Sequence, residues 1–172
     1  MEFTSKRYEF RNKAADYASL AAELHGLLTG ERDFTANAAN TTALLFEALP
    51  DVNWVGFYFL RSTETQPEGE LVVGPFQGKP ACVRIPLGKG VCGTAAATRK
   101  TVLVRDVHEF AGHIACDAAS QSEIVVPLIK NGALLGVLDI DSPRMARFDE
   151  ADQRGIERLA TIFVDASDAR SR

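Results

Sequence analysis

The three cysteines of this 172-residue chain lie close together in the sequence, at Cys82, Cys92 and Cys116. Each lies near a glycine or a turn signal, in the segments QGKPACV, GKGVCGT and GHIACDAAS. Loops between regular elements often carry the functional side chains of a protein. This concentration of sulfur therefore predicts either thiol redox chemistry or metal binding.

The surroundings of the three cysteines predict different roles. Cys92 falls in the expected first turn of a short helix, where the helix dipole would lower its pKa. It could equally be a small apolar residue in a tight turn. Cys116 lies beside His113 and Asp117 in a long irregular segment, and loops of that kind are usually functional. Cys82 lies in a strand-like run, which by itself favours an inert buried cysteine.

Zinc binding is the weaker of the two chemistries. His108, His113 and Cys116 could join Cys82 and Cys92 around one ion. Structural zinc sites usually use pairs of ligands that are two to four residues apart. Here nine and twenty-three residues separate successive cysteines, and only His113-x-x-Cys116 has a suitable spacing. The spacing therefore favours redox chemistry.

Three carboxylates and two aromatic residues lie in strand-like segments. Asp139 and Asp141 are two residues apart and share a face of their strand, and Glu123 belongs to the same predicted hairpin. Such acids either meet solvent, or they line a pocket that binds an ammonium group or retains a proton. Trp54 and Tyr58 also share a strand face, as core residues or as the wall of a ligand pocket.

Thiols, acids and aromatic rings in one place would suit the reduction of a sulfur–oxygen bond. A thiol attacks the sulfur of a sulfoxide while an acid protonates the oxygen, which is otherwise a poor leaving group. The resulting sulfenic acid condenses with a second thiol to a disulfide. An external dithiol then reduces that disulfide.

The elements that position these residues follow from periodicity and turn signals. The pattern predicts an α+β fold with an antiparallel sheet and with the terminal helices packed on one face. Gly30 and Pro50 are expected to end the first two helices, Asn131-Gly132 to form a hairpin turn, and Asp149 to cap the last helix. The expected helices are 5–29, 35–49, a short one within 88–100, and 148–166. The expected strands are 53–60, 71–76, 81–87, 101–107 and a hairpin over 122–142, with loops at 62–70 and 108–120.

Composition limits the function classes. The chain is 46% hydrophobic and 24% charged, which is ordinary for one globular domain. The net charge of −4 and the lack of a basic tract argue against a nucleic-acid partner. No apolar run reaches the ~20 residues of a membrane helix, and the N-terminus lacks the apolar core of a signal peptide. We therefore expect a cytoplasmic protein, in which any disulfide is transient.

Several segments closely resemble one enzyme family. The segments GPFQGKPACVRIP, GKGVCGTA, GHIACDAAS, SEIVVPL and GVLDIDS, together with the aromatic strand NWVGFY, are similar to those of the free methionine-(R)-sulfoxide reductases, which are built on a GAF domain. The resemblance implies a single GAF-like domain with a six-stranded sheet, in which residues 1–30 form an N-terminal helix and 31–172 the GAF domain. It also implies a homodimer, free methionine sulfoxide as substrate, thioredoxin as reductant, and no metal or other cofactor.

The same resemblance implies a role for each cysteine. Cys116 would attack the sulfoxide sulfur and become the sulfenic acid. Cys82 would form the recycling disulfide with it, which replaces the inert role that its local sequence favours. Cys92 would be an auxiliary thiol near the substrate.

The acids and aromatic residues also receive roles from the resemblance. Glu123, Asp139 and Asp141 would bind the substrate. They would also assist proton delivery to the sulfoxide oxygen, and Glu123 and Asp141 are the two expected to be catalytic. Trp54 and Tyr58 would line the pocket around the methyl sulfoxide group. The alternative is a non-catalytic GAF sensor of a small molecule, which would have no need of three cysteines.

Overall fold

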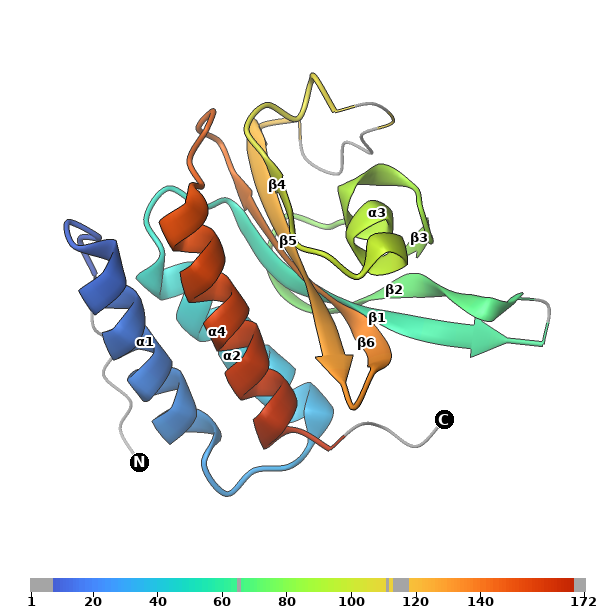
Figure 1. The fold of residues 1–172 in the computed structure, drawn as a ribbon, viewed down its shortest axis with the longest axis horizontal. Helices are drawn as coiled ribbons and strands as arrows, with labels where there is room; N and C mark the ends of the chain where they lie inside the picture. The colour runs from blue at the N-terminus through green and yellow to red at the C-terminus, as the bar shows by residue number, and fades with distance from the viewer. Residues whose placement is uncertain (1–7, 65, 111, 113–117, 169–172) are drawn as a thin grey trace.

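The protein is described by a computed structural model that covers residues 8–64, 66–110, 112 and 118–168. Its strands form one six-stranded antiparallel sheet with the order β3-β2-β1-β6-β5-β4. Figure 1 shows α1, α2 and α4 on one side of this sheet, with α1 packed on the other two helices, and α3 on the opposite side. This confirms the predicted α+β architecture with the terminal helices on one face. The elements are α1 Lys13–Leu28, α2 Phe34–Ala48, β1 Trp54–Thr63, β2 Gln66–Gly78, β3 Arg84–Pro86, α3 Gly90–Thr98, β4 Val102–Val104, β5 Ser122–Lys130, β6 Ala133–Ser142 and α4 Glu150–Ala166.

The three-helix face of the sheet is held by a large apolar cluster. The apolar face of α4 is buried there through Ile156, Leu159 and Phe163, none of which exposes any surface. Asp149 caps α4 as predicted, and Asp152 completes a reciprocal capping box with it. These contacts fix α4 against the sheet, so this face is built for stability.

The strand period of two divides β1 between the two faces of the sheet. Val55, Phe57 and Phe59 belong to the cluster beneath the three helices. Trp54 and Tyr58 belong to the second cluster, which packs against α3. A single strand therefore supplies the structural core with one set of side chains and the opposite face with the other.

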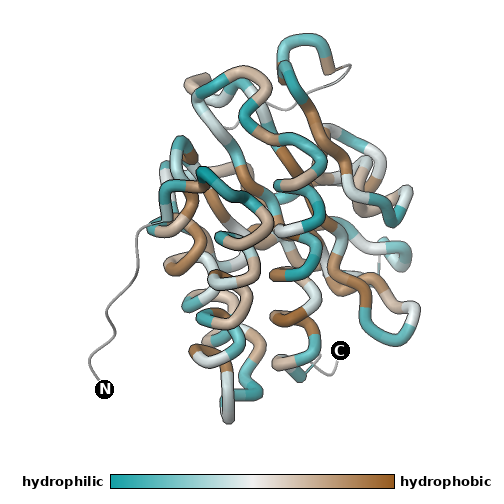
Figure 2. Tube along the Cα trace, turned by 60° about the vertical axis from the view of Figure 1, so that its left-hand side comes forward, coloured by the Kyte–Doolittle hydropathy of each residue, from teal (hydrophilic) through white to brown (hydrophobic). Residues whose placement is uncertain are grey.

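Hydrophobic and hydrophilic residues alternate along the helices instead of forming long apolar runs, as Figure 2 shows. None of the helices in the described part of the chain has the length and apolar character that crossing a bilayer requires.

Two turn predictions are confirmed by backbone conformation. Gly30 has a φ of 87° just after α1, and Asn131 and Gly132 have φ values of 51° and 79° between β5 and β6. Positive φ at both central residues is the mark of the two-residue turn that suits a right-twisted hairpin. This turn, together with the register shift between Leu128 and Ile129, sets the register in which Glu123 pairs with Asp141.

Several predicted boundaries are wrong, and one of them is the strand expected at 101–107, which is only Val102–Val104, β4. The first helix begins at Lys13, capped by Asn12, and residues 8–12 precede it without helix. The expected loop at 62–70 is instead the tip of a ribbon, because β1 and β2 pair as far as Thr63 and Gln66. The strand expected at 81–87 is reduced to three residues, β3.

Candidate active site

The sheet register brings the predicted acids and aromatic residues together on the α3 face. Trp54 of β1 is opposite Asp141 of β6, and two residues further along Gly56 is opposite Asp139. On the other side of β6, Glu123 of β5 is also opposite Asp141. The three acids therefore come from adjacent strands and share one face, which alternation had predicted for Asp139 and Asp141.

Two aromatic rings form one wall of this site. The rings of Trp54 and Tyr58 are stacked, with centroids 5.8 Å apart, and the ring of Phe76 is also stacked with the indole, at 5.4 Å. The indole crosses Gly56, where an added Cβ would lie 2.2 Å from it. The indole Nε1 also donates a hydrogen bond of 3.1 Å to the carbonyl of Lys79. Glycine at 56 is thus the residue that lets Trp54 lie flat.

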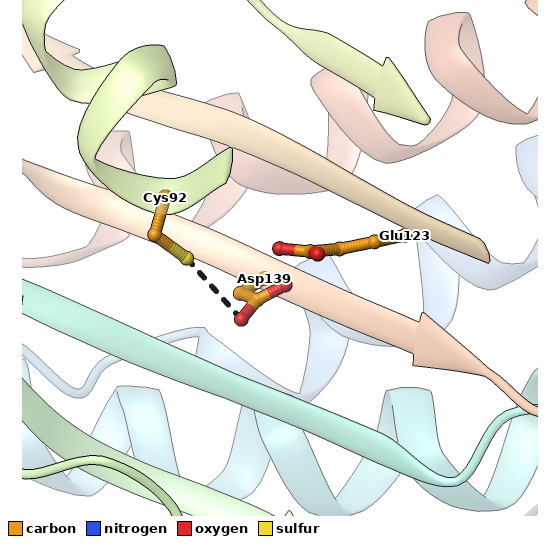
Figure 3. Close-up of side chains that lie close together, drawn as sticks. All are labelled: Cys92, Glu123 and Asp139. Atoms are coloured by element: carbon orange, nitrogen blue, oxygen red, sulfur yellow. Dashed lines mark hydrogen bonds between the residues drawn. The ribbon is translucent and has the colours of Figure 1, made fainter. Parts of the chain in front are cut away.

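The floor of the site is a buried cluster of one thiol and two carboxyl groups. Cys92, the third residue of α3, donates a hydrogen bond of 3.2 Å from Sγ to Oδ2 of Asp139. Figure 3 shows the carboxyl group of Glu123 extending from β5 toward Asp139. The exposed fractions are only 4% for Cys92, 5% for Glu123 and 6% for Asp139. We call these three side chains the Cys92 cluster.

Burial controls the protonation of both acids in the Cys92 cluster. Burial, and after it the negative charges of Asp139 and Asp141, raises the pKa of Glu123 well above its usual value. Burial also raises the pKa of Asp139 to about 7, although its hydrogen bonds with Cys92 and Glu123 act in the opposite direction. Because burial raises the pKa of both carboxyl groups and each lies beside the other, the pair favours keeping a proton.

The structure contradicts one of the two sequence interpretations of Cys92, the thiol with a lowered pKa. A position in the first turn of α3 predicted a lowered pKa, and this is wrong. Burial, followed by the charges of Asp139 and Glu123, raises the pKa of Cys92 well above its usual value. A helix N-terminus contributes only ~0.3–1 kcal/mol, which cannot offset burial beside two acids. Cys92 is therefore a thiol that donates a hydrogen bond.

A cavity of about 530 Å³, counted with its open mouth, lies over the Cys92 cluster. It brings together six of the predicted residues. It also contains residues that the sequence analysis missed, among them two lysines in the glycine-containing turns QGKPA and GKG, whose only signal was their position beside those turns. The lining residues are Trp54, Tyr58, Lys79, Pro80, Ala81, Ile85, Lys89, Gly90, Val91, Cys92, Ser120, Glu123, Asp139 and Asp141.

Cys82 is not among the residues that line the described cavity. Cys82 follows Ala81, which does line it, and the partly buried side chain of Cys82 packs against the apolar cluster of the α3 face. Cys116 lies outside the described residues. The structure thus places Cys92 in the cavity and Cys82 next to its wall.

Known proteins resemble this chain over most of its length. A GAF-domain family model matches residues 35–166. The free methionine-R-sulfoxide reductase of Escherichia coli K12 is 53% identical over 86% of this chain and 86% of its own length. The protein of the same name from Saccharomyces cerevisiae is 44% identical over 88% and 86%. The chain belongs to the free methionine-R-sulfoxide reductases of the GAF-domain family.

A solved structure extends the likeness to three dimensions. The free methionine-R-sulfoxide reductase of Neisseria meningitidis, in complex with its substrate, superposes with a TM-score of 0.86 at 44% identity. The likeness covers 96% of this chain and 95% of that one. The resemblance inferred from sequence motifs is thereby confirmed, and the chain is an oxidoreductase by family.

The family motifs of this reductase converge in space. NWVGFY supplies the aromatic wall, SEIVVPL supplies Glu123, GVLDIDS supplies Asp139 and Asp141, and GKGVCGTA supplies Cys92. These segments are separated along the chain but meet at one cavity because β1, β6 and β5 are neighbours in the sheet.

Proposed function

We propose that this protein reduces free L-methionine (R)-sulfoxide to methionine. The observation that carries the proposal is the buried Glu123–Asp139 pair, which keeps a proton in a cavity walled by Trp54 and Tyr58. A sulfoxide oxygen leaves sulfur readily only when it is protonated, so a neutral carboxylic acid at this place is the group that the reaction needs. The rings would hold the methyl sulfoxide, since their apolar faces exclude water.

The thiols would carry the two electrons. The thiol of Cys116 attacks the sulfoxide sulfur, the protonated oxygen moves from that sulfur to Sγ of Cys116 as the bond between the two sulfur atoms breaks, and methionine leaves a sulfenic acid on Cys116. The thiol of Cys82 then condenses with the sulfenic acid, which forms a disulfide and releases water. Thioredoxin reduces this disulfide by thiol–disulfide exchange. Cys92 stays protonated and acts as an auxiliary thiol that orients Asp139.

The two ends of a free amino acid have different partners in this cavity. Asp141, with Asp139 and Glu123 behind it, would bind the substrate ammonium group. The first turn of α3 would bind the substrate carboxylate, because its N-cap residue, Lys89, makes no side-chain capping bond. Lys79 and Lys89 add positive charge to the same wall. A peptide lacks both charges on that carbon, so selection for the free amino acid follows.

The proposal includes the assembly and location that the family resemblance implies. The enzyme would act as a homodimer in the cytoplasm, where thioredoxin is available and thiols remain reduced.

Turnover with resolved epimers tests this function. The protein is incubated with racemic free methionine sulfoxide, thioredoxin and thioredoxin reductase, and both epimers are followed. We expect the (R) epimer alone to disappear, and N-acetylmethionine sulfoxide, which lacks the ammonium group, to react far more slowly. A sensor would consume neither epimer and would lose no thiols, whereas the reductase without thioredoxin should lose two.

A further inference from the structure

We propose that the Cys92 cluster is also a binding site for a single divalent ion of the Zn²⁺ class. Sγ of Cys92 and one oxygen each from Glu123 and Asp139 would coordinate the ion. Bound there, the ion would occupy the floor of the cavity and block the reductase reaction. The inhibitory part of this inference rests on the proposed function, and the binding part does not.

The donor atoms have the spacing of a metal site. One ligand atom from each of the three side chains lies within 4.8 Å of the other two. With Zn–S near 2.3 Å and Zn–O near 2.1 Å, donors of a tetrahedral zinc ion lie about 3.5 Å apart. The separation of 3.2 Å between Sγ of Cys92 and Oδ2 of Asp139 is already close to that value. Small side-chain rotations would therefore complete the site.

A second observation points to a ligand beyond the spacing. Oδ1 of Asp139 is buried and has no assigned hydrogen-bond partner among the described residues, so the proton that the carboxyl group shares with Glu123 is what neutralises it. In Figure 3 the carboxyl groups of Asp139 and Glu123 extend toward each other from neighbouring strands. A buried carboxylate oxygen without a donor must be neutralised by a proton or by a cation. Oδ1 of Asp139 can therefore bind either a proton or a metal ion.

The chemistry of the donors selects the class of ion. A thiolate with two carboxylates suits Zn²⁺, whereas the hard ions Mg²⁺ and Ca²⁺ prefer oxygen ligands alone. The donors come from β5, β6 and α3, which fix their positions, and the cavity provides an entry path. A water molecule in the cavity would be the fourth ligand. The open coordination position would resemble that of a catalytic zinc site, but the ion would displace the protons of the cluster.

Displacement of these protons makes the ion an inhibitor. With zinc bound, Glu123 and Asp139 cannot protonate a sulfoxide oxygen, and Cys92 no longer donates to Asp139. The ion would also stand where the substrate ammonium group is proposed to lie. Metal and substrate would therefore exclude each other.

Metal titration of the reduced protein tests the binding part. Co²⁺ is added, without oxygen, to the parent, to Cys92→Ser and to the matched control Cys82→Ser, and Zn²⁺ is then used to displace it. We expect one ion per chain and a thiolate-to-cobalt charge-transfer band for the parent and for Cys82→Ser. Cys92→Ser should lose the band and at least ~100-fold in affinity, beyond the 10–100-fold typical of supporting residues.

A second variant keeps the test decisive if Cys92→Ser is poorly folded. Asp139→Asn retains the shape of the side chain but removes its charge, so it should weaken zinc binding while far-ultraviolet circular dichroism stays unchanged. Equal affinity of the parent and of folded Asp139→Asn would overturn the proposal. So would a cobalt spectrum without a thiolate band, or a band that is lost in Cys82→Ser.

Competition separates this inference from the proposed function. Free methionine sulfoxide should reduce the apparent zinc affinity of the parent, and Zn²⁺ should raise the apparent KM for the sulfoxide. Zinc binding in a protein that fails to reduce the sulfoxide would overturn the proposed function and leave the site intact. A zinc-free enzyme that is active but binds no Zn²⁺ would overturn only the site.

Discussion

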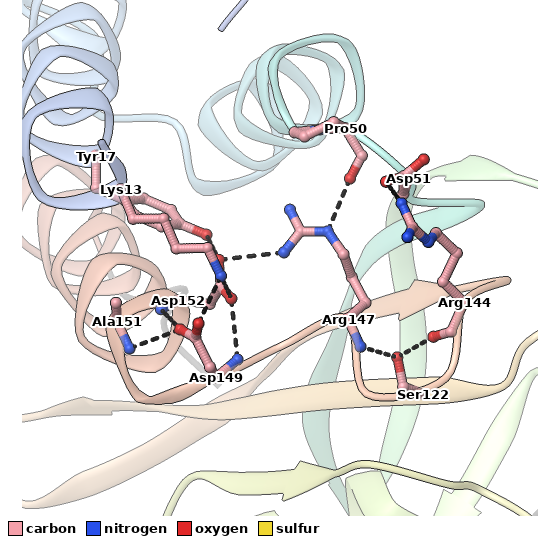
Figure 4. A network of polar contacts seen from close by, with 10 residues as sticks. All are labelled: Lys13, Tyr17, Pro50, Asp51, Ser122, Arg144, Arg147, Asp149, Ala151 and Asp152. Atoms are coloured by element: carbon pink, nitrogen blue, oxygen red, sulfur yellow. Dashed lines mark hydrogen bonds and ion pairs between the residues drawn. The ribbon is translucent and has the colours of Figure 1, made fainter. Parts of the chain in front are cut away.

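Two fully or almost fully buried carboxylic acids in this protein have opposite surroundings. Asp152, at the start of α4, exposes no surface and accepts hydrogen bonds from Tyr17 at 2.9 Å, Lys13 at 2.5 Å and Arg147 at 3.2 Å (Figure 4). Asp139, in the cavity, accepts its bond from Cys92 and faces a second acid, Glu123 (Figure 3). The first acid is neutralised by cations and the second by protons.

This difference separates a structural acid from a chemical one. A buried carboxylate must be paired with a positive charge or keep a proton. Asp152 joins α1, α4 and the segment after β6 through Lys13 and Arg147, so its charge holds elements together. In the proposed reaction, Asp139 and Glu123 hold the proton that is given to the substrate. Similar burial thus leads to different functions because the partners differ.

The largest expected effect tests whether the cavity acts through a thiol at all. Cys116→Ser should abolish turnover, because no sulfenic acid can form on the reacting sulfur. Cys82→Ser is its matched control, since it keeps the attacking thiol and should still reduce about one equivalent of substrate before recycling slowly. Consumption of the (R) epimer is measured under single-turnover and steady-state conditions. Steady-state activity of Cys116→Ser within a few-fold of the parent would refute the assignment.

The next test removes the proton donor without removing its shape. Glu123→Gln should lower kcat by ~10²–10⁴-fold, the range typical of lost acid–base catalysis. Its free energy of unfolding should not fall, because the change removes an ionisable group that is costly to bury. Glu47→Gln, the same change at an exposed position of α2, serves as the control. If Glu123→Gln does not fold, or if it folds and its kcat is unchanged, Glu123 is not the proton donor that we propose.

The reciprocal test removes the structural acid. Asp152→Asn should lower the free energy of unfolding by about 3–5 kcal/mol, because Lys13 and Arg147 lose their buried counter-charge. The kcat of the folded fraction should stay close to that of the parent. Chemical denaturation is compared with that of Asp165→Asn, an exposed position on the same helix. If Asp152→Asn keeps its stability but loses its kcat, the two acids have been assigned the wrong way round.

The raised pKa of Asp139 should make both stability and catalysis depend on pH. The pKa of Asp139 is raised from 3.8 to about 7, so the folded protein holds a proton that the unfolded chain has released. Its contribution to stability is therefore complete below about pH 4 and decreases as the pH rises to about 7. Catalysis should also decline above about pH 7, by up to tenfold per unit, as the acid loses its proton. Asp139→Asn should remove that part of the stability profile, and an unchanged profile would contradict the assignment.

The smallest expected effect lies at the cap of α4. The hydrogen bond from Lys13, more than any other contact, lowers the pKa of Asp149 to about 2. Asp149→Ala should cost about 0.5–2 kcal/mol of stability, the usual range for a lost N-cap, and should leave kcat unchanged. Because the pKa is lowered, the charge of Asp149 stabilises the fold above about pH 4 and this contribution disappears toward pH 2. A loss of catalysis in Asp149→Ala would show that the contacts at the start of α4 are coupled to the Cys92 cluster.

The strongly periodic parts of the fold could be predicted from the sequence. The stripe of α4 and the Asn131-Gly132 turn each follow from short-range rules, because the deciding contacts lie within a few residues. The ribbon tip around Thr63 and Gln66 could not be predicted. Backbone pairing holds it together, and its mainly exposed side chains leave no alternation of apolar residues in the sequence.

The candidate site was predictable in composition but not in electrostatics. Alternation placed Asp139 and Asp141 on one face, and family motifs supplied the remaining residues. Neither could show that Cys92, forty-seven positions before Asp139, would contact its carboxyl group and acquire a raised pKa. That contact depends on how α3 packs on β5 and β6. The lysines at 79 and 89 were missed because nothing in their local pattern separates them from surface lysines.

The protonation state of the Cys92 cluster tests the central claim most directly. Carboxyl ¹³C resonances of labelled aspartate and glutamate can be followed against pH, with Glu123 and Asp139 assigned by their loss in Glu123→Gln and Asp139→Asn. The account predicts that Glu123 is protonated at neutral pH and that the Asp139 resonance titrates near pH 7. Two resonances that are fully ionised down to about pH 5, close to ordinary carboxyl behaviour, would contradict it.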